Sequence, residues 1–207
     1  MKNDALLTRP TLLLRMRDSR DQAAWEQFVE IYTPLVYGFC RQRGLQDADA
    51  EDVCQDVMRT VARGAGQFEY DPARGKFRNW LLTVVRSKMA NFFASRQRQP
   101  DPAGPTTLQQ LAESEPGADE QSEWDARYHR HIFQWACERI RAEFQEATWQ
   151  AFWKTTVEDR DGKEVADGLN MSVGAVYVAK SRVLARLRQE IEFVEAEDTL
   201  GPRRLKA

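Results

Sequence analysis

An acidic stretch near residue 50 carries the side chains that come closest to a catalytic metal site. Asp49, Asp52 and Asp56 would share one face of a helix, because residues three and four positions apart are neighbours there. Carboxylates placed in this way could bind magnesium, but magnesium enzymes also recruit substrate phosphates, and no phosphate-binding loop lies nearby. We therefore interpret this face as a surface that contacts another protein, with a merely solvated helix face as the alternative.

The other reactive side chains form no catalytic or metal-binding pattern. His129 and His131 are separated by one residue, which points them to different sides of a helix and makes a poor shared metal site. The chain lacks the glycine-rich signatures of nucleotide-binding loops and the Gly-x-Ser-x-Gly signature of a serine nucleophile. Cys40, Cys54 and Cys137 are far apart, so we expect buried free thiols in a reducing compartment. The sequence predicts no enzyme, no cofactor and no metal site.

A second group of residues, which starts at Phe68, combines cations with aromatic rings. Arg74, Lys76, Arg78, Arg86 and Lys88 could bind phosphates, and they are interleaved with Phe68, Tyr70, Phe77 and Trp80. Stacking on an aromatic ring is worth about 1–3 kcal/mol per base, comparable with the ~1.4 kcal/mol lost per opened duplex step. The segment therefore predicts a surface that can hold a locally melted strand. We expect Phe77 and Trp80 to be mostly core, whereas Phe68 and Tyr70 lie in a loop and are freer to meet a base.

The stretch from Lys163 to Arg188 has the pattern of a short helix, a tight turn and a longer basic helix, with apolar residues at helical spacing on both sides of the turn. Asn170 tolerates the left-handed conformation that ends a helix, and Ser172 is well suited to cap the next one. The second helix carries Lys180, Arg182, Arg186 and Arg188, opposed only by Glu190 at its end. The pattern predicts a helix-turn-helix, whose second helix enters the DNA major groove, with an ordinary helical hairpin as the alternative.

Helices must position nearly all of these side chains. Glycine and proline are sparse and no stretch alternates apolar and polar residues over strand length, so the predicted fold is all-α. We expect helices over about 23–43, with a kink or break at Pro34, from about residue 49, and over 77 to about 97. Residues 98–122 hold four prolines and a surplus of acid, which indicates a flexible linker. Helical periodicity resumes at Trp124.

The predicted organisation is two small helical domains joined by the acidic linker. We expect an N-terminal extension over 1–19, a first domain over 20–97, the linker over 98–122, a second domain over 123–192 and a tail over 193–207. Charge is segregated along the chain. Residues 74–98 hold seven basic residues and no acidic one, residues 99–126 hold seven acidic residues and no basic one, and the net charge is −2. No long apolar segment occurs, so we expect a cytoplasmic protein without a membrane span.

Three motifs stand in order along the chain: DADAEDVCQDV at 47–57, GKFRNWLLTVVR at 75–86 and VADGLNMSVGAV at 165–176. Together they resemble the bacterial extracytoplasmic function (ECF) sigma factors, group 4 of the sigma-70 family. The family's corresponding patterns are D-A-E-D-x-x-Q-E-V in region 2.2, F-R-x-W-L-x-x-I-A-R in regions 2.3 and 2.4, and I-A-E-x-L-G-I-S-V-G-T-V in region 4.2. The resemblance covers about residues 20–192, and three ordered motifs are far more specific than any one alone.

The resemblance implies a protein that binds core RNA polymerase and directs it to promoter DNA, with no catalysis and no cofactor of its own. The surface on the clamp helices of the largest polymerase subunit would comprise Asp49, Glu51, Asp52, Gln55 and Asp56, and the polymerase flap is a second expected contact. The −10 element would be captured as a single strand by Phe68, Tyr70, Arg74, Lys76, Arg78, Asn79, Trp80, Arg86, Ser87, Lys88 and Asn91. The −35 element would be read by Ser172, Val173, Gly174, Ala175, Tyr177, Val178, Lys180, Ser181, Arg182 and Arg186. The linker would thread toward the active centre and the RNA exit path, where its negative charge mimics RNA.

The chain also departs from the family pattern. Tyr177-Val178-Ala179 stands where family members often have Lys-Ser-Arg, so exposed cations are fewer and the −35 preference is expected to differ. Many family members are held by an anti-sigma factor, and such a partner is expected from the resemblance alone. Two alternatives stay open at this point: a helix-turn-helix transcriptional regulator whose residues 20–97 sense a ligand or dimerise, and a nucleic-acid enzyme acting through the acidic helix at 49–63.

Overall fold

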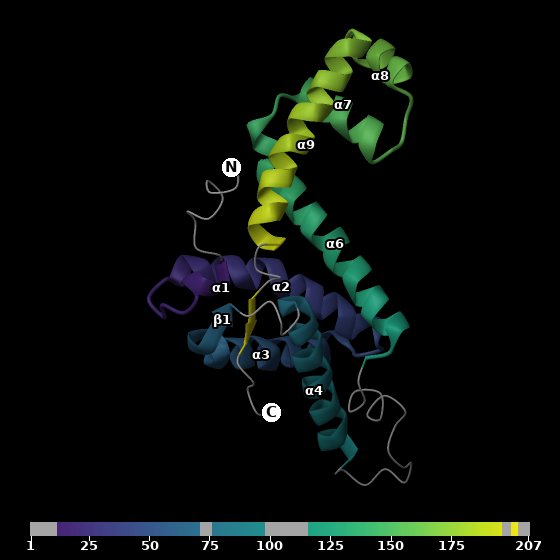
Figure 1. Ribbon diagram of the computed structural model, residues 1–207. Helices are drawn as coiled ribbons and strands as arrows, with labels where there is room; N and C mark the ends of the chain where they lie inside the picture. The colour runs from purple at the N-terminus through teal and green to yellow at the C-terminus, as the bar shows by residue number, and fades with distance from the viewer. Residues whose placement is uncertain (1–11, 71–75, 98–115, 196–199, 203–207) are drawn as a thin grey trace. The chain divides into compact units, whose positions relative to one another are not determined.

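The computed structural model describes residues 12–70, 76–97, 116–195 and 200–202, and almost all of them are helical (Figure 1). The predicted all-α fold class is confirmed. The chain divides into two compact units. The first comprises Met1–His129 and Val194–Ala207, and the second comprises Arg130–Phe193. The domain boundaries expected from the sequence stay a prediction, and each unit is described by itself.

The first unit includes the helices α1 (Leu12–Arg15), α2 (Gln22–Gln42), α3 (Asp47–Gly64) and α4 (Phe77–Gln97). Helix α3 packs against both α2 and α4 (Figure 1). The core between them is aromatic. The rings of Phe28 and Tyr32 stack at 4.5 Å, and Phe77 meets Tyr32 edge-on at 5.5 Å. All three side chains are buried, which fixes the first turn of α4 against α2.

Of the kink or break expected at Pro34 of helix α2, the break does not occur. The helix runs from Gln22 to Gln42 with Pro34 inside it. Its start is well defined, because the Asp21 carboxylate accepts a hydrogen bond from the backbone N–H of Ala24 and two from the guanidinium of Arg15. The hydrogen bond from Arg15, together with that cap, holds the pKa of Asp21 below its usual value. The pair links α1 to α2.

A short antiparallel ribbon was not predicted from the sequence, which placed Phe68 and Tyr70 in a loop. After the 3-10 turn η1 (Ala65–Gln67), strand β1 (Phe68–Tyr70) pairs with strand β2 (Leu200–Pro202) near the C-terminus. Phe68 stands opposite Pro202, and Tyr70 stands opposite Leu200. Three residues are too few to show an alternating pattern, and the partner strand is distant in sequence.

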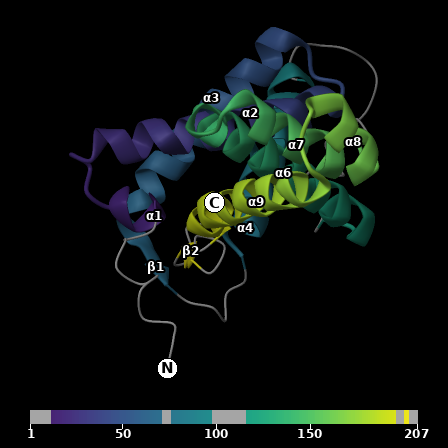
Figure 2. The same ribbon diagram turned by 90° about the horizontal axis from the view of Figure 1, so that it is seen from above.

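The remaining elements are α6 (Ala118–Ile140), the 3-10 turn η3 (Arg141–Glu143), α7 (Glu146–Thr156), α8 (Gly162–Leu169) and α9 (Val173–Glu195). Helix α6 begins inside the stretch expected to be linker. Its residues 118–129 belong to the first unit and the rest to the second. In the second unit, α7 and α8 gather at the N-terminal end of α9 (Figure 2). A cluster of small apolar residues fills the space between these three helices: Ala151, Val165, Ala166, Val176 and Ala179.

The turn between α8 and α9 has the predicted chemistry. Asn170 ends α8 in the left-handed region, with φ 51° and ψ 43°. The Ser172 hydroxyl accepts a hydrogen bond of 3.1 Å from the backbone N–H of Ala175, so it caps α9. At the other end of α8, the Asp161 carboxylate caps the N–H groups of Lys163 and Glu164. Helix α8 is therefore capped at both ends and α9 at its start, and the predicted helix-turn-helix is present.

Candidate nucleic-acid and polymerase interfaces

Helix α9 presents one continuous exposed face. Tyr177, Val178, Ser181, Arg182 and Ala185 line a shallow depression on it. Tyr177 is 54% exposed and Val178 is 59% exposed. Large side chains so exposed are typical of surfaces that contact a partner, and a hydroxyl and a guanidinium beside them supply hydrogen-bond donors. The face therefore offers both apolar and polar contacts along one side of a helix.

Two other cations of α9, Lys180 and Arg186, are engaged within the second unit. Lys180 is half-buried, and its Nζ donates a hydrogen bond of 3.2 Å to the carbonyl of Thr155. The Arg186 guanidinium donates to both carboxylate oxygens of Glu143 at 2.8 Å and to Glu190 at 2.8 Å. These hydrogen bonds to Glu143 and Glu190 raise the pKa of Arg186. Arg182 is the −35 candidate cation that lies on the exposed face of α9.

The small residues at the start of α9 leave room around the exposed face. Ser172 caps the helix, Val173 is 37% exposed, Gly174 is exposed and Ala175 is half-buried.

Gly162 is a residue that the sequence reasoning missed. A Cβ atom at that position would lie 3.0 Å from the Tyr177 hydroxyl and 3.2 Å from the ring carbon that carries it. The glycine therefore allows the Tyr177 ring to rest on the first residue of α8.

The acidic face of α3 is on the surface, as its sequence pattern indicates. Glu51, Asp52, Gln55 and Asp56 are exposed. Arg59 forms an ion pair with Asp56 and a hydrogen bond of 3.0 Å with Gln55. Asp49 is half-buried and pairs with Arg96 of α4 at 3.0 Å. Within the described residues, Glu51 and Asp52 form no ion pair, so their carboxylates stay available to a cationic partner.

The −10 candidates at Lys76 and on α4 separate into two groups. Those that solvent reaches are Lys76, Asn79, Trp80, Ser87, Lys88 and Asn91, of which Trp80, Ser87 and Lys88 are half-buried. The ring of Trp80 contacts Phe77 at 5.4 Å, so part of it is core, as expected. Arg74 and the side chains of Phe68 and Tyr70 lie outside the described residues. The reachable group combines two cations with amides and one aromatic edge.

Arg78 and Arg86 form the second group, whose side chains solvent hardly reaches. Both are buried, at 5% and 4% exposure. The Nε atom of Arg78 lies 2.7 Å from the Asp125 carboxylate, and its guanidinium sits 5.1 Å from the centre of the Tyr128 ring. An Nη atom of Arg86 lies 3.3 Å from the Glu120 carboxylate. In this structure both guanidinium groups therefore face acids of α6, and a contact of either with DNA stays a prediction.

The acids that hold these arginines were missed as site residues, although a signal for them exists. The seven basic residues over 74–98 are followed by seven acidic residues over 99–126. Opposite charges on neighbouring segments attract, so the segregation could have suggested pairing within the chain as well as separate partners. Glu143, which binds Arg186, carries no comparable signal, because it lies outside the segregated acidic and basic stretches.

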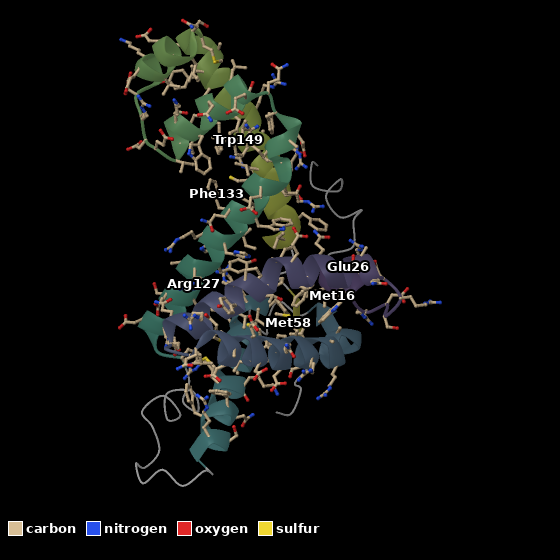
Figure 3. All side chains as sticks on the ribbon, turned by 180° about the vertical axis from the view of Figure 1, so that it is seen from behind. Met16, Glu26, Met58, Arg127, Phe133 and Trp149 are labelled. Carbon is tan, nitrogen blue, oxygen red and sulfur yellow. The ribbon has the colours of Figure 1, made fainter. Side chains whose placement is uncertain are left out.

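The cysteines are free and buried, as predicted. The hydrogen bond with Cys54 and burial raise the pKa of the Cys40 thiol, and burial raises the pKa of Cys137 to about 11. Cys137 lines a cleft of the second unit between α6 and α7, together with Phe133 and Trp149 (Figure 3). Thiols with such pKa values stay protonated near neutral pH and are weak nucleophiles.

The described residues form neither a metal-binding cluster nor a membrane-spanning helix. Across residues 12–70, 76–97, 116–195 and 200–202, no group of three or more His, Cys, Asp or Glu side chains is placed to hold a metal ion. Among the helices in those ranges, none has the length and apolar character needed to cross a membrane.

The chain is similar to known proteins in sequence and in structure. The family model of sigma-70 region 2 matches residues 28–99, which include α3 and α4. The chain is 31% identical over 187 residues to the ECF RNA polymerase sigma factor RpoE of Cereibacter sphaeroides, a match that covers 87% of this chain and 93% of the relative. A solved structure, Rhodobacter sphaeroides SigE in complex with the anti-sigma ChrR, shares 28% identity with a TM-score of 0.36, covering 86% of this chain and 94% of that one. A sigma-70 region and a curated relative matched over nearly its whole length show that the chain belongs to the ECF sigma factors of the sigma-70 family.

Proposed function

We propose that this sigma factor binds core RNA polymerase and directs it to promoters, with α9 reading the −35 element and α4 capturing the melted −10 strand. The observation that carries the proposal is the exposed face of α9, where Tyr177, Val178 and Arg182 stand together on the second helix of a capped helix-turn-helix. Such a helix fits the major groove, where arginine binds guanine edges and apolar groups meet thymine methyls. Ser172, Val173, Gly174, Ala175 and Ser181 border this face, whereas Lys180 and Arg186 hold α9 to its own unit.

The −10 strand would lie along Lys76 and the reachable side chains of α4. Lys76 and Lys88 bind phosphates, Asn79, Ser87 and Asn91 offer hydrogen bonds, and Trp80 offers part of a ring. Phe68, Tyr70 and Arg74 complete this surface as expectations from the sequence. Arg78 and Arg86 can join it only when their carboxylate partners on α6 withdraw.

The acidic face of α3 is the proposed contact with the clamp helices of the largest polymerase subunit. Glu51 and Asp52 supply exposed carboxylates, while Asp49, Gln55 and Asp56 lie on the same helix with partners of their own. Exposed like charges on one surface steer a cationic partner and set its orientation. The polymerase flap and an anti-sigma factor are further proposed partners that follow from the family.

Reconstitution with core RNA polymerase tests the proposed function. The purified chain and core enzyme would transcribe fragmented bacterial DNA, and sequencing of RNA 5′ ends would map the starts. Specific starts that share two upstream elements are the expected result. Random starts, or a symmetric DNA footprint formed without polymerase, would contradict the proposal and favour a dimeric regulator.

Replacing Lys88 with alanine tests the −10 surface through its salt dependence. A lost phosphate contact lowers the slope of log K against log salt by about one unit. We expect this change for formation of the promoter complex by the Lys88→Ala holoenzyme. Arg20→Ala is the matched control, because Arg20 is an exposed cation of the first unit outside the proposed surface. Equal slopes for Lys88→Ala and wild type would show that Lys88 does not touch DNA.

Replacing Asp52 with alanine tests the polymerase surface. The affinity for core polymerase should fall by about 1 kcal/mol, or roughly fivefold in Kd, because an exposed carboxylate loses its cationic partner. The fold should stay intact, since surface changes typically alter stability by about 0.5 kcal/mol or less. Competition with a labelled sigma factor for core enzyme measures the affinity. Glu26→Ala on α2 is the control for loss of an exposed acid (Figure 3), and a similar effect of both variants would remove the assignment.

A further inference from the structure

Ion pairs hold the N-terminal half of α6, residues 118–129, in place within the first unit. Its carboxylates pair with arginines that are buried or half-buried. Glu120 lies 2.9 Å from Arg43 and 3.3 Å from Arg86, so one carboxylate bridges two guanidinium groups. Asp125 lies 2.7 Å from Arg78. One helix of the chain thus supplies the counter-charges for Arg43, directly after α2, and for two arginines of α4.

The contact extends to a third residue of the proposed −10 surface. The side-chain amide of Gln121 donates a hydrogen bond of 3.0 Å to the Asn79 side chain. Of the α4 residues proposed to meet DNA, Arg78, Asn79 and Arg86 therefore all bind residues 118–129 of α6. The same segment carries an excess of acid, with Asp119, Glu120, Glu123 and Asp125 against Arg127 alone.

Apolar contacts fix the register of this docking. Trp124 is fully buried, its ring meets Phe39 edge-on at 5.1 Å, and its Nε1–H donates to the carbonyl of Arg78 at 3.0 Å. Arg127 lies over Gly38 of α2, where a Cβ atom would come within 2.6 Å of its Nη1 atom (Figure 3). The N-terminal half of α6 thus packs in one defined position against α2 and α4.

A carboxylate and a DNA phosphate are alternative partners for the same guanidinium group. Both are oxyanions that bind the planar N–H donors of arginine, and phosphate contacts supply most of the affinity of proteins for DNA without sequence preference. Arg78 and Arg86 are almost completely buried, so a phosphate cannot reach them while α6 is docked. Occupation by α6 and occupation by DNA exclude each other at these positions.

We propose that the N-terminal half of α6 is an intramolecular competitor of DNA, which covers part of the −10 surface in the free sigma factor and leaves it when a strand is captured. The inference rests on the proposed role of α4 in holding the −10 strand. When only the released state binds fully, the apparent affinity is reduced by the fraction of released molecules. Weakening the docking should therefore strengthen DNA binding by the free chain.

Two variants weaken the docking by different physics. Glu120→Gln with Asp125→Asn removes the counter-charges of Arg78 and Arg86, and Trp124→Ala removes the buried anchor without any change of charge. The charge-matched control is Asp119→Asn with Glu138→Gln, which neutralises two exposed acids of the same helix. Hydrogen exchange of residues 118–129 reports whether the helix half is released.

The measurement is fluorescence anisotropy of a labelled, mixed-sequence single strand of about 16 nucleotides, titrated with the full-length free chain. Both docking variants should bind at least about tenfold more tightly than wild type, whereas the control should change affinity by less than about twofold. Wild-type affinity in a variant whose residues 118–129 exchange faster would overturn the competition. The competition would also be overturned if the hydrogen-exchange protection of residues 118–129 in the wild-type protein did not change when the strand binds. Neither readout involves polymerase, so specific initiation by the wild-type holoenzyme alongside either result would sink this inference and leave the proposed function standing.

Discussion

Trp124→Ala is expected to lower the free energy of unfolding of the first unit by about 3–5 kcal/mol, the usual cost of removing a buried tryptophan. The indole is fully buried, contacts the Phe39 ring, and donates its N–H to the Arg78 carbonyl. The variant loses these contacts and leaves a cavity too large to close without movement. A fall in Tm of more than about 10 °C follows for a unit of this size, measurable by circular dichroism.

Trp25→Ala is the matched control for this prediction. Trp25 is also in the first unit and stacks on Phe28 at 5.7 Å, but it is only half-buried. Trp25→Ala should lower the free energy of unfolding by clearly less than Trp124→Ala, because fewer contacts disappear and solvent already reaches the ring. If residues 118–129 detach instead of leaving a cavity, the loss at Trp124 is limited to the docking free energy of that segment. Equal melting temperatures for wild type and Trp124→Ala would show that the indole does not anchor α6.

Arg78→Ala is the second prediction with a large expected effect. Removing one member of a fully buried ion pair typically costs about 3–5 kcal/mol, because the other charge is left without a partner. The Arg78 side chain is 6% exposed, but its partner Asp125 is 31% exposed and can be hydrated after the change. We therefore expect a smaller loss, about 2–3 kcal/mol, measured by urea unfolding.

The neighbour Lys76 provides the contrast for Arg78. It is an exposed cation one position before the start of α4, so Lys76→Ala should alter stability by about 0.5 kcal/mol or less. Whether Lys76 or Arg78 contributes more to the binding of promoter DNA should depend on whether residues 118–129 of α6 are docked. Lys76 should contribute a phosphate contact whether or not residues 118–129 are docked, whereas Arg78 should contribute only after their release. A stable Arg78→Ala protein with a wild-type urea midpoint would contradict the structural role assigned to this pair.

Features that depend on a few neighbouring residues could be predicted from the sequence, and the helix-turn-helix of the second unit is one of them. Asn170 in the left-handed region and Ser172 as a cap depend on a few neighbouring atoms, so their residue types are sufficient evidence. The apolar face of α4 was also readable, because Phe77 and its buried neighbours recur at helical spacing. These features require no knowledge of where the rest of the chain lies.

Long-range pairing was not readable in the same way. The periodicity of α4 marks Arg78 and Arg86 as polar positions and therefore as surface, but it does not show that another helix brings acids to them. The engagement of Arg186 by Glu143 has the same origin. A cation on a helix looks alike in sequence whether it faces water, DNA or a carboxylate of its own chain. The candidate DNA surfaces were therefore predicted by location, while the availability of their charges was not.

The ribbon between β1 and β2 has a consequence for the order in which the molecule can be completed during synthesis. Strand β1 leaves the ribosome well before β2, and the whole second unit is translated between them. Domains generally fold as they emerge, N-terminal parts first. The second unit can therefore fold while β1 still lacks its partner strand. The segment containing Phe68 and Tyr70 reaches its final backbone pairing only when Leu200–Pro202 have emerged, so a nascent chain cut short before these residues would carry an unfinished first unit.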